Sequence, residues 1–144
     1  MTVKILYGSE TGNAEGLAYD AKKNLDSHNI KSEVINMADV SIGDLINYEK
    51  MIIITSTWGD GEPPTNAESL YNELENNTNM EFPNLKYSIF AIGQAFYENF
   101  CKTGIDFDKF LENHKAKRIL PVEMSDDDFS DKFPDWLEKV RESL

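Results

Sequence analysis

The run Met51-Ile52-Ile53-Ile54-Thr55 (MIIIT) is the part of this sequence that says most about the fold. It is a continuous apolar stretch, without the alternation of apolar and polar residues that marks a strand with one wet face. Short unbroken runs rich in isoleucine are typical of strands that are buried on both faces, as in a parallel sheet covered by helices. We therefore expect residues 51–55 to form a central strand of such a sheet.

Strand patterns and helical patterns alternate on both sides of this run. Strands are expected at residues 3–7, 31–36, 51–55, 87–92 and 119–124. Helices are expected from apolar residues at helical spacing within 14–25, 67–74, 107–111 and 136–144. Strands that alternate with helices indicate an α/β fold, here a doubly wound five-stranded parallel sheet with strand order 2-1-3-4-5 and helices on both faces. We expect a single domain over residues 1–144.

Pro121 lies inside the last expected strand. Because proline has no N–H to donate to a sheet, this strand should lie at an edge, and the order 2-1-3-4-5 places the fifth strand there. In this fold class, ligands bind outside the carboxyl ends of the strands, near the point where the strand order reverses. A site is therefore expected in the loops after the first, third and fourth strands.

The 26 acidic and 14 basic residues give the chain a net charge of −12. This excess of acid disfavours nucleic acid and an anionic membrane surface as partners and favours a basic protein. One cysteine, Cys101, excludes an internal disulfide, and the two histidines, His28 and His114, which we expect at exposed helix positions, disfavour a metal site. No apolar run is long enough to span a membrane and the N-terminus reads as a strand, which favours a cytoplasmic protein.

The segment Ser9-Glu10-Thr11-Gly12-Asn13-Ala14 follows the first strand and opens a helix. Ser9, Thr11 and Asn13 offer side-chain donors. Gly12 allows a tight turn, and the free N–H groups and dipole of a helix N-terminus favour an anion. Since the segment has no Lys or Arg and lacks the glycine spacing of nucleoside-triphosphate and dinucleotide loops, it indicates a single phosphate held by neutral donors. An ordinary helix N-cap is the alternative.

Aromatic residues mark the loops after the third and fourth strands. The third strand is followed by Thr57-Trp58-Gly59-Asp60-Gly61, and the fourth by residues 93–101, which contain two Phe and Tyr97. An indole exposed at the ligand end of a sheet is costly unless a flat partner covers it, and Tyr97 can cover the other face of that partner. The alternatives are that Trp58 packs on its own domain and that the two Phe belong to the core. Together, the three loops describe one elongated ligand with a phosphate at one end and a planar ring at the other, which fits a mononucleotide.

In these three loops the sequence resembles the flavodoxin family, whose members carry flavin mononucleotide (FMN), and the match covers essentially the whole chain. Residues 9–13 are similar to the phosphate loop of the family, 57–61 to its first flavin loop and 97–101 to its second, where the tyrosine stacks on the flavin. The loops are most similar to those of the FMN domains of diflavin reductases such as the sulfite reductase flavoprotein. The resemblance implies a flavodoxin-like fold and a cofactor site made of Ser9, Glu10, Thr11, Gly12, Asn13, Ala14, Thr57, Trp58, Gly59, Asp60, Gly61, Gly93, Gln94, Tyr97, Asn99, Phe100, Cys101 and Asp127. Asp127 stands here for the run Asp126–Asp128, because the resemblance leaves open which of the three carboxylates contacts the ribityl chain.

The implied function is that of a low-potential one-electron carrier with non-covalently bound FMN, which shuttles electrons from a reductase to an acceptor enzyme and is not itself an enzyme. We expect a monomer of the short-chain type. The expected partners are redox proteins with a basic surface, namely a flavodoxin or ferredoxin reductase as the donor and an enzyme of the reductase or monooxygenase type as the acceptor. Acidic residues around the loops disfavour extra negative charge on the cofactor, which lowers its potential. The alternatives are an FMN-dependent quinone or azo reductase and a flavin-binding accessory protein for a specific enzyme.

Overall fold

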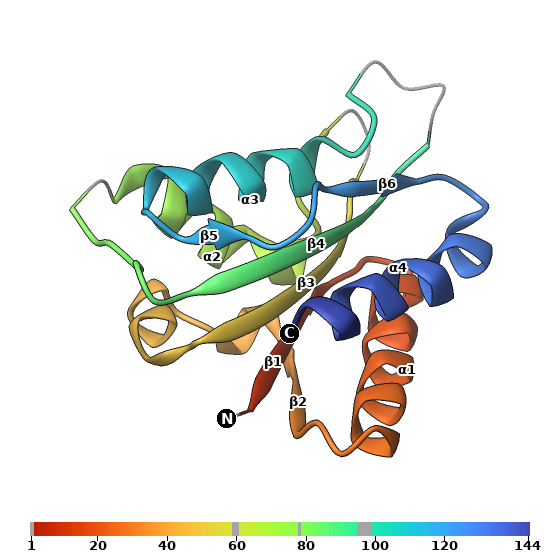
Figure 1. Ribbon diagram of the computed structural model, residues 1–144. Coiled ribbons are helices and arrows are strands. Elements are labelled where there is room, and N and C mark those ends of the chain that lie inside the picture. Colours follow the sequence, from red (N-terminus) through yellow and green to blue (C-terminus); the bar gives the residue numbers. More distant parts are fainter. Residues whose placement is uncertain (1, 59–60, 78, 95–98) are drawn as a thin grey trace.

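The computed structural model describes residues 2–58, 61–77, 79–94 and 99–144 (Figure 1). The strands form one parallel sheet in the order β2-β1-β3-β4-β5, and β6 also pairs with β4. The strands are β1 (Val3–Gly8), β2 (Ser32–Asn36), β3 (Lys50–Ser56), β4 (Lys86–Ile92), β5 (Lys117–Arg118) and β6 (Glu123–Ser125). The helices are α1 (Asn13–Ser27), α2 (Glu68–Asn76), α3 (Lys102–Asn113) and α4 (Phe129–Ser143), with 3-10 helices η1 (Met37–Asp39), η2 (Ile42–Asn47) and η3 (Thr65–Ala67). The α/β fold and the strand order expected from the sequence are confirmed.

The apolar run at residues 51–55 lies within β3, in the middle of the sheet between β1 and β4. Each residue from Met51 to Thr55 is at most 1 % exposed. A parallel strand covered by helices on both faces has no wet side, which is why this run shows no alternation in polarity. Because the burial of one large aliphatic side chain contributes about 1.5–3 kcal/mol to the free energy of unfolding, the isoleucines of β3 make this strand the energetic centre of the sheet.

One pair of helices covers each face of the sheet (Figure 1). Helices α1 and α4 pack on one face, where Trp136 of α4 joins Ile5 of β1 in a first apolar cluster. Helices α2 and α3 pack on the other face, where Phe107 of α3 joins Leu6 of β1 in a second cluster. Since successive side chains of a strand point to opposite faces, the neighbours Ile5 and Leu6 belong to different clusters.

The last strand differs from the single strand expected at residues 119–124. It is replaced by two short strands, β5 and β6, which both pair with β4. The N–H of Ile119 still donates to the carbonyl oxygen of Tyr87 at 2.7 Å, and the ladder then stops before Pro121, which has no N–H to donate. The described part of the sheet therefore has six strands rather than five. Both short strands lie at the sheet edge, as Pro121 predicts.

His114 is buried, and our expectation of an exposed helix position is wrong. It is 3 % exposed and comes directly after the end of α3, where the helical pattern no longer tells which side is covered. Its Nδ1 lies 2.6 Å from the carbonyl oxygen of Met80 and its Nε2 lies 2.9 Å from that of Leu74. The ring stacks on Phe82. His114 thus joins the end of α2 to the segment that leads into β4, whereas His28 is exposed as expected.

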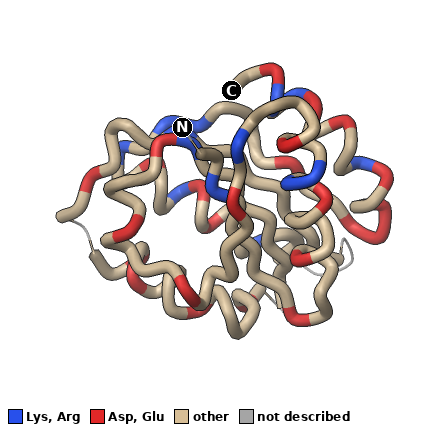
Figure 2. The backbone as a smooth tube through the Cα atoms, turned by 90° about the horizontal axis from the view of Figure 1, so that it is seen from below, with Lys and Arg blue, Asp and Glu red and all other residues tan. Residues whose placement is uncertain are grey.

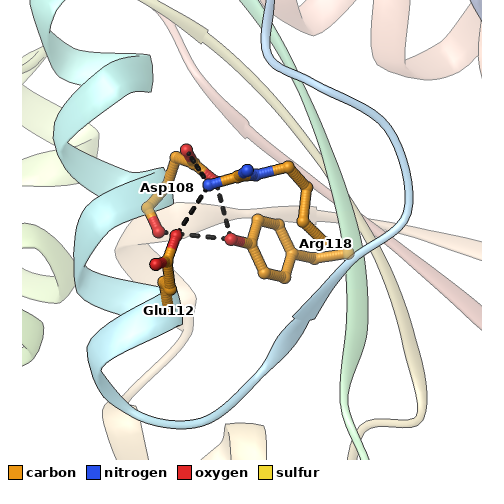
Figure 3. A network of polar contacts seen from close by, with 4 residues as sticks. Asp108, Glu112 and Arg118 are labelled. Atoms are coloured by element: carbon orange, nitrogen blue, oxygen red, sulfur yellow. Dashed lines mark hydrogen bonds and ion pairs between the residues drawn. The ribbon is translucent and has the colours of Figure 1, made fainter.

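A polar network joins the short strand β5 to α3 (Figure 3). Arg118 of β5 donates to the two carboxylate oxygens of Asp108 at 2.8 and 2.7 Å and to the carboxylate of Glu112 at 2.8 Å. The hydroxyl of Tyr87 on β4 donates to Asp108 at 2.6 Å. Burial, and then this carboxylate, raise the pKa of the Tyr87 hydroxyl above its ordinary value. The network holds the edge of the sheet against the helix whose first turn reaches the carboxyl ends of the strands.

The close packing of α3 on β4 gives a first testable prediction. A Cβ atom added to Gly104 would lie 2.5 Å from the Cβ of Ala91. We expect Gly104→Ala to lower the free energy of unfolding by about 1–3 kcal/mol, because helix or strand must shift to relieve the overlap. Gly16→Ala in α1 is the matched control: a Cβ there meets nothing within 4 Å, so the better helix propensity of alanine should stabilise the protein by up to about 1 kcal/mol. Urea unfolding measures both, and equal stability of the two variants would contradict the close contact.

Candidate functional site

A cavity of about 450 Å³ opens at the carboxyl ends of β1, β3 and β4. These strands are neighbours in the sheet, so the loops after them converge as expected. A volume of this size is typical of sites for small molecules and cofactors. The described residues that line the cavity are Glu10, Thr11, Asn13, Ser56, Thr57, Trp58, Ile92, Gly93, Gln94, Asn99, Phe100, Cys101, Asp126, Asp127 and Phe129.

The loop after β1 forms a turn that presents backbone donors at the start of α1. Gly12 has a φ of +86°, in the left-handed region that favours glycine. The hydroxyl oxygen of Ser9 accepts hydrogen bonds from the N–H of Gly12 at 2.9 Å and from that of Ala14 at 3.4 Å. Within the described residues the N–H groups of Thr11 and Asn13 have no acceptor, and both residues line the cavity. This end of the cavity is therefore suited to an anion.

Glu10 ties this loop to the segment that follows β3. Its carboxylate accepts hydrogen bonds from the N–H of Thr65 at 2.6 Å and from the hydroxyl of Thr65 at 2.9 Å. The N–H of Ser9 donates to the side-chain oxygen of Asn66 at 3.0 Å. Thr65 and Asn66 belong to η3, so the first and second loops of the cavity are bound to each other.

The loop after β3 is closed by two backbone hydrogen bonds between Trp58 and Glu62. The N–H of Trp58 donates to the carbonyl oxygen of Glu62 at 2.7 Å, and the N–H of Glu62 donates back at 2.8 Å. The indole of Trp58 is 52 % exposed and lines the cavity, so it is not a core side chain of its own domain. It offers a flat apolar face to a ring-shaped ligand. Gly59 and Asp60, also expected in the site, lie outside the described residues.

Both described ends of the loop after β4 lie at the cavity. Phe100 is half-buried there and belongs to neither apolar cluster, which sets aside the alternative that it is a core residue. Tyr97, expected to stack on a planar ring, lies outside the described residues. The expected site residues of this loop that line the cavity are Gly93, Gln94, Asn99, Phe100 and Cys101.

Cys101 anchors the start of α3 to the sheet. Its backbone has a φ of +55°, and its thiol lies 3.5 Å from the carbonyl oxygen of Ala91 and 3.6 Å from that of Ser125. A Cβ on Gly93 would lie 2.8 Å from the backbone nitrogen of Cys101, so this close crossing of two segments requires glycine. The part of the cavity wall at the start of α3 is therefore connected directly to β4 and β6.

The acidic run after β6 contributes Asp126 and Asp127 to the cavity, whereas Asp128 is not among the lining residues. A carboxylate oxygen of Asp128 accepts a hydrogen bond from the N–H of Asp126 at 3.0 Å, and this bond is the main cause that lowers the pKa of Asp128. Asp128 also lies 3.5 Å from the ammonium group of Lys132. Asp128 therefore shapes the turn before α4, and the carboxylates that border the cavity are those of the two residues before it.

Four lining residues were not among the expected site residues. Ser56 and Ile92 are the last residues of β3 and β4, and Phe129 is the first residue of α4. Their position at the end of a strand or helix that borders the predicted site was the sequence signal that could have identified them. Asp126 belongs to the acidic run 126–128, from which one carboxylate was expected in the site without a choice among the three; Asp127 alone was named in the expected set. Conversely, some expected residues shape the loops without lining the cavity, namely Ser9, Gly12, Ala14 and Gly61.

Charge is distributed unevenly between the two ends of the sheet. Among the described residues, no Lys or Arg lines the cavity. At the opposite end, Lys50, Lys86 and Lys117 are register neighbours on β3, β4 and β5. Figure 2 shows several basic positions close to the N-terminus of the chain, with acidic positions spread over the rest of the tube. The chain has a net charge of −12. The cavity lies at the end of the sheet where none of the described lining residues is a Lys or an Arg.

The chemistry of the site is set by neutral N–H and hydroxyl donors at one end, an exposed indole, and carboxylates at the rim. Within the described ranges, no group of three or more His, Cys, Asp or Glu is placed to hold a metal ion. No helix in the same ranges is long and apolar enough to cross a bilayer. Such an arrangement can bind a phosphate at one end and a planar ring at the other.

The buried thiol gives a second prediction. Burial is the main cause that raises the pKa of Cys101 to about 11, from an ordinary value of 9.0. At about pH 8 we expect a disulfide reagent to react with the folded protein far more slowly than with the protein in urea, because only the thiolate attacks and the thiol is covered. Between about pH 9 and pH 11 the unfolded chain loses this proton first, so the free energy of unfolding should fall as the pH rises. Rapid labelling of the folded protein would contradict this account.

Comparison with known proteins agrees over nearly the whole chain. The sequence model of a family described as Flavodoxin matches residues 5–137. The sulfite reductase (NADPH) flavoprotein alpha-component of Bacillus subtilis (strain 168) is 39 % identical over 142 residues, which cover 99 % of this chain and 24 % of that protein. The protein of the same name from Vibrio cholerae serotype O1 (strain ATCC 39315 / El Tor Inaba N16961) is 35 % identical over 136 residues, 94 % of this chain and 22 % of the relative. The chain thus spans about a quarter of the length of the curated relatives it matches.

Solved structures give the same result for the fold. Oxidised flavodoxin 2 from Bacillus cereus superimposes with a TM-score of 0.87 at 26 % sequence identity, over 100 % of both chains. A flavodoxin from Streptococcus pneumonia TIGR4 superimposes with a TM-score of 0.84 at 24 % identity, also over 100 % of both chains.

Proposed function

The chain belongs to the flavodoxin family, and we propose that it carries single electrons at low potential from a reductase to an acceptor enzyme. Its cofactor is FMN and its role is electron transfer. The observation that carries the proposal is the meeting, at one cavity, of two N–H groups at the start of α1 that have no acceptor among the described residues with the exposed indole of Trp58. The relatives do not favour the alternative of a quinone or azo reductase.

The residues at the α1 end of the cavity fit the phosphate of FMN. The N–H groups of Thr11 and Asn13, which have no acceptor among the described residues, are the donors that we assign to it. Gly12 gives the turn its left-handed step, and the hydroxyl of Ser9 holds that turn closed. A helix N-terminus favours an anion even without Lys or Arg. The phosphate end of the cofactor therefore needs no basic side chain in this chain.

The other end of the cavity fits a flat ring. We assign Trp58 to one face of the flavin, where stacking contributes about 0.5–1.5 kcal/mol beyond the burial of apolar area. Thr57, Gly93, Gln94 and residues 99–101 border the same space. The expected roles of the remaining loop residues, Gly59, Asp60, Gly61 and Tyr97, stay part of the proposal. When bound, FMN supplies the electron chemistry, and the protein supplies binding, orientation and electrostatics.

The charges at the rim support a low potential. Asp126 and Asp127 border the cavity, and the ammonium group of the nearby Lys102 is paired with the carboxylate of Asp106. At about 10 Å and an effective dielectric constant of about 40, one carboxylate disfavours an added negative charge by roughly 0.8 kcal/mol. Since about 1.4 kcal/mol corresponds to about 60 mV for one electron, the two carboxylates together lower the potential by about 70 mV.

The same charges point to the kind of partner. An acidic rim around a redox site favours a basic surface on the other protein, as in other transient electron-transfer encounters. We propose a flavodoxin or ferredoxin reductase as the donor and an enzyme of the reductase or monooxygenase type as the acceptor. We also propose that residues 1–144 act as one domain and as a monomer in the cytoplasm.

Cofactor binding can be tested with the phosphate group as the variable. We expect FMN to bind to the flavin-free protein and riboflavin, which lacks the phosphate, to bind at least about 100-fold more weakly, because hydrogen bonds to a charged group contribute about 1.5–3 kcal/mol each. Quenching of flavin fluorescence measures both affinities. Gly12→Ala should weaken FMN about fivefold or more through strain in the turn and leave riboflavin unchanged. Equal affinities for the two flavins would overturn the assignment of the phosphate end.

The proposed role of the acidic rim can be tested with salt. We expect electron transfer to a basic haem protein such as cytochrome c to slow as the salt concentration rises, because the screening length falls to about 10 Å at 0.1 M. At low salt, Asp127→Asn should slow the reaction about two- to threefold. Glu49→Gln removes the same charge at the amino end of β3, the far end of the sheet, and should leave the rate nearly unchanged. Equal effects of the two variants would show that net charge, and not the rim, guides the encounter.

A further inference from the structure

Thr103, in the first turn of α3, contacts both ends of the loop after β3. It is completely buried. Its backbone N–H donates to the hydroxyl oxygen of Thr57 at 3.1 Å, and its own hydroxyl donates to the carbonyl oxygen of Glu62 at 3.2 Å. One residue thus binds the residue before Trp58 and the residue that closes the loop with Trp58.

Gly61 of this loop packs closely against the start of α3. Gly61 has a φ of +123°, and a Cβ atom there would lie 2.8 Å from the Cδ of Lys102 and 2.9 Å from the Cβ of Asn99. The stem of Lys102 is fixed in turn, because its ammonium group pairs with Asp106 one helical turn later. Gly61 therefore has no space to approach α3 further, and the hydrogen bond from Thr103 opposes movement of the neighbouring Glu62 away from it.

The start of α3 is a fixed reference point for this contact. Cys101 holds it to the carbonyl oxygens of Ala91 on β4 and Ser125 on β6. The N–H of Thr57 also donates to the carbonyl oxygen of Ile92 at 2.9 Å, which fixes the first end of the loop to β4. The second end, at Glu62, has a different anchor: its carbonyl oxygen accepts from Trp58, within the loop, and from Thr103, outside it.

We propose that Thr103 is a positioning residue for the cofactor: its hydroxyl fixes Glu62, the second end of the loop after β3, against α3 and so sets how Trp58 meets the flavin. The inference rests on the proposed function for its redox consequence. Groups that surround a redox cofactor tune its potential through hydrogen bonds and charge. A loop held at both ends keeps these groups in one place when the charge on the cofactor changes. A loop held at one end is free to settle differently in each redox state.

The test uses Thr103→Val, which keeps the shape and removes the hydroxyl, and Thr103→Ser, which keeps the hydroxyl. In the flavin-free protein, hydrogen exchange of the Trp58 and Glu62 amides reports on the loop. We expect exchange about fivefold faster in Thr103→Val, the effect of one lost hydrogen bond. In the FMN-loaded protein, a fivefold change in the balance between redox states corresponds to a shift of about 40 mV in one of the two one-electron midpoint potentials. Thr103→Ser should restore both values to those of the wild type.

The outcomes separate the inference from the proposed function. If Thr103→Val lowers only the melting temperature while exchange and potentials match the wild type, the residue is merely structural and the inference is wrong. Faster exchange with unchanged potentials also overturns it, because the loop would then be held without consequence for the cofactor. If the wild type fails to bind FMN, the proposed function is wrong, and the redox part of the inference is wrong with it. The exchange rates still decide whether the hydroxyl holds the loop.

Discussion

The pairing of β3 with β1 on one side and β4 on the other is the constraint on which the rest of the molecule depends. The register sets Gly8 beside Thr55, and Thr55 beside Ala91, so the three strands end at nearly the same level. Their loops leave the sheet side by side, which is the origin of the cavity. A slip of one residue in either pairing would turn each side chain of β3 to the opposite face, and the burial of its isoleucines on both sides does not by itself prevent this. The hydrogen bonds that join the loops at the strand ends favour the observed register over such a slip.

Those contacts connect the loops to one another as well as to the sheet. Glu10 reaches η3 through Thr65, Thr57 donates to the end of β4, and Thr103 joins Glu62 to α3. Each bond contributes only about 1 kcal/mol net. Their combined effect is to leave few arrangements open to the loops, and a site that is already ordered loses less conformational freedom when a ligand binds. The division of polarity, with neutral donors at the phosphate end and carboxylates at the rim, follows from which loop lies where.

What the sequence predicted correctly is what local patterns encode. The apolar run of β3 predicted a strand buried on both faces, and Gly12 predicted a tight turn before α1. The failures concern contacts between distant segments. Pro121 interrupts the last strand because it has no N–H to donate, but the pairing of both remaining pieces with β4 is a contact between distant segments. The burial of His114 likewise depends on where α2 ends. The cavity residues that escaped prediction belong to the ends of elements, whose exact limits depend on neighbours rather than on their own side chains: Ser56, Ile92 and Phe129.

The two apolar clusters on either side of the sheet share no side chain, although both draw on the same strands. Substitutions in the layer of α1 and α4 and in the layer of α2 and α3 should therefore be close to additive in their effects on stability, because among the described residues no side chain belongs to both clusters. A substitution in one layer should therefore need no compensating change in the other. What both must preserve is the backbone of the sheet between them, with glycine where another segment approaches it closely, as at Gly93 and Gly104.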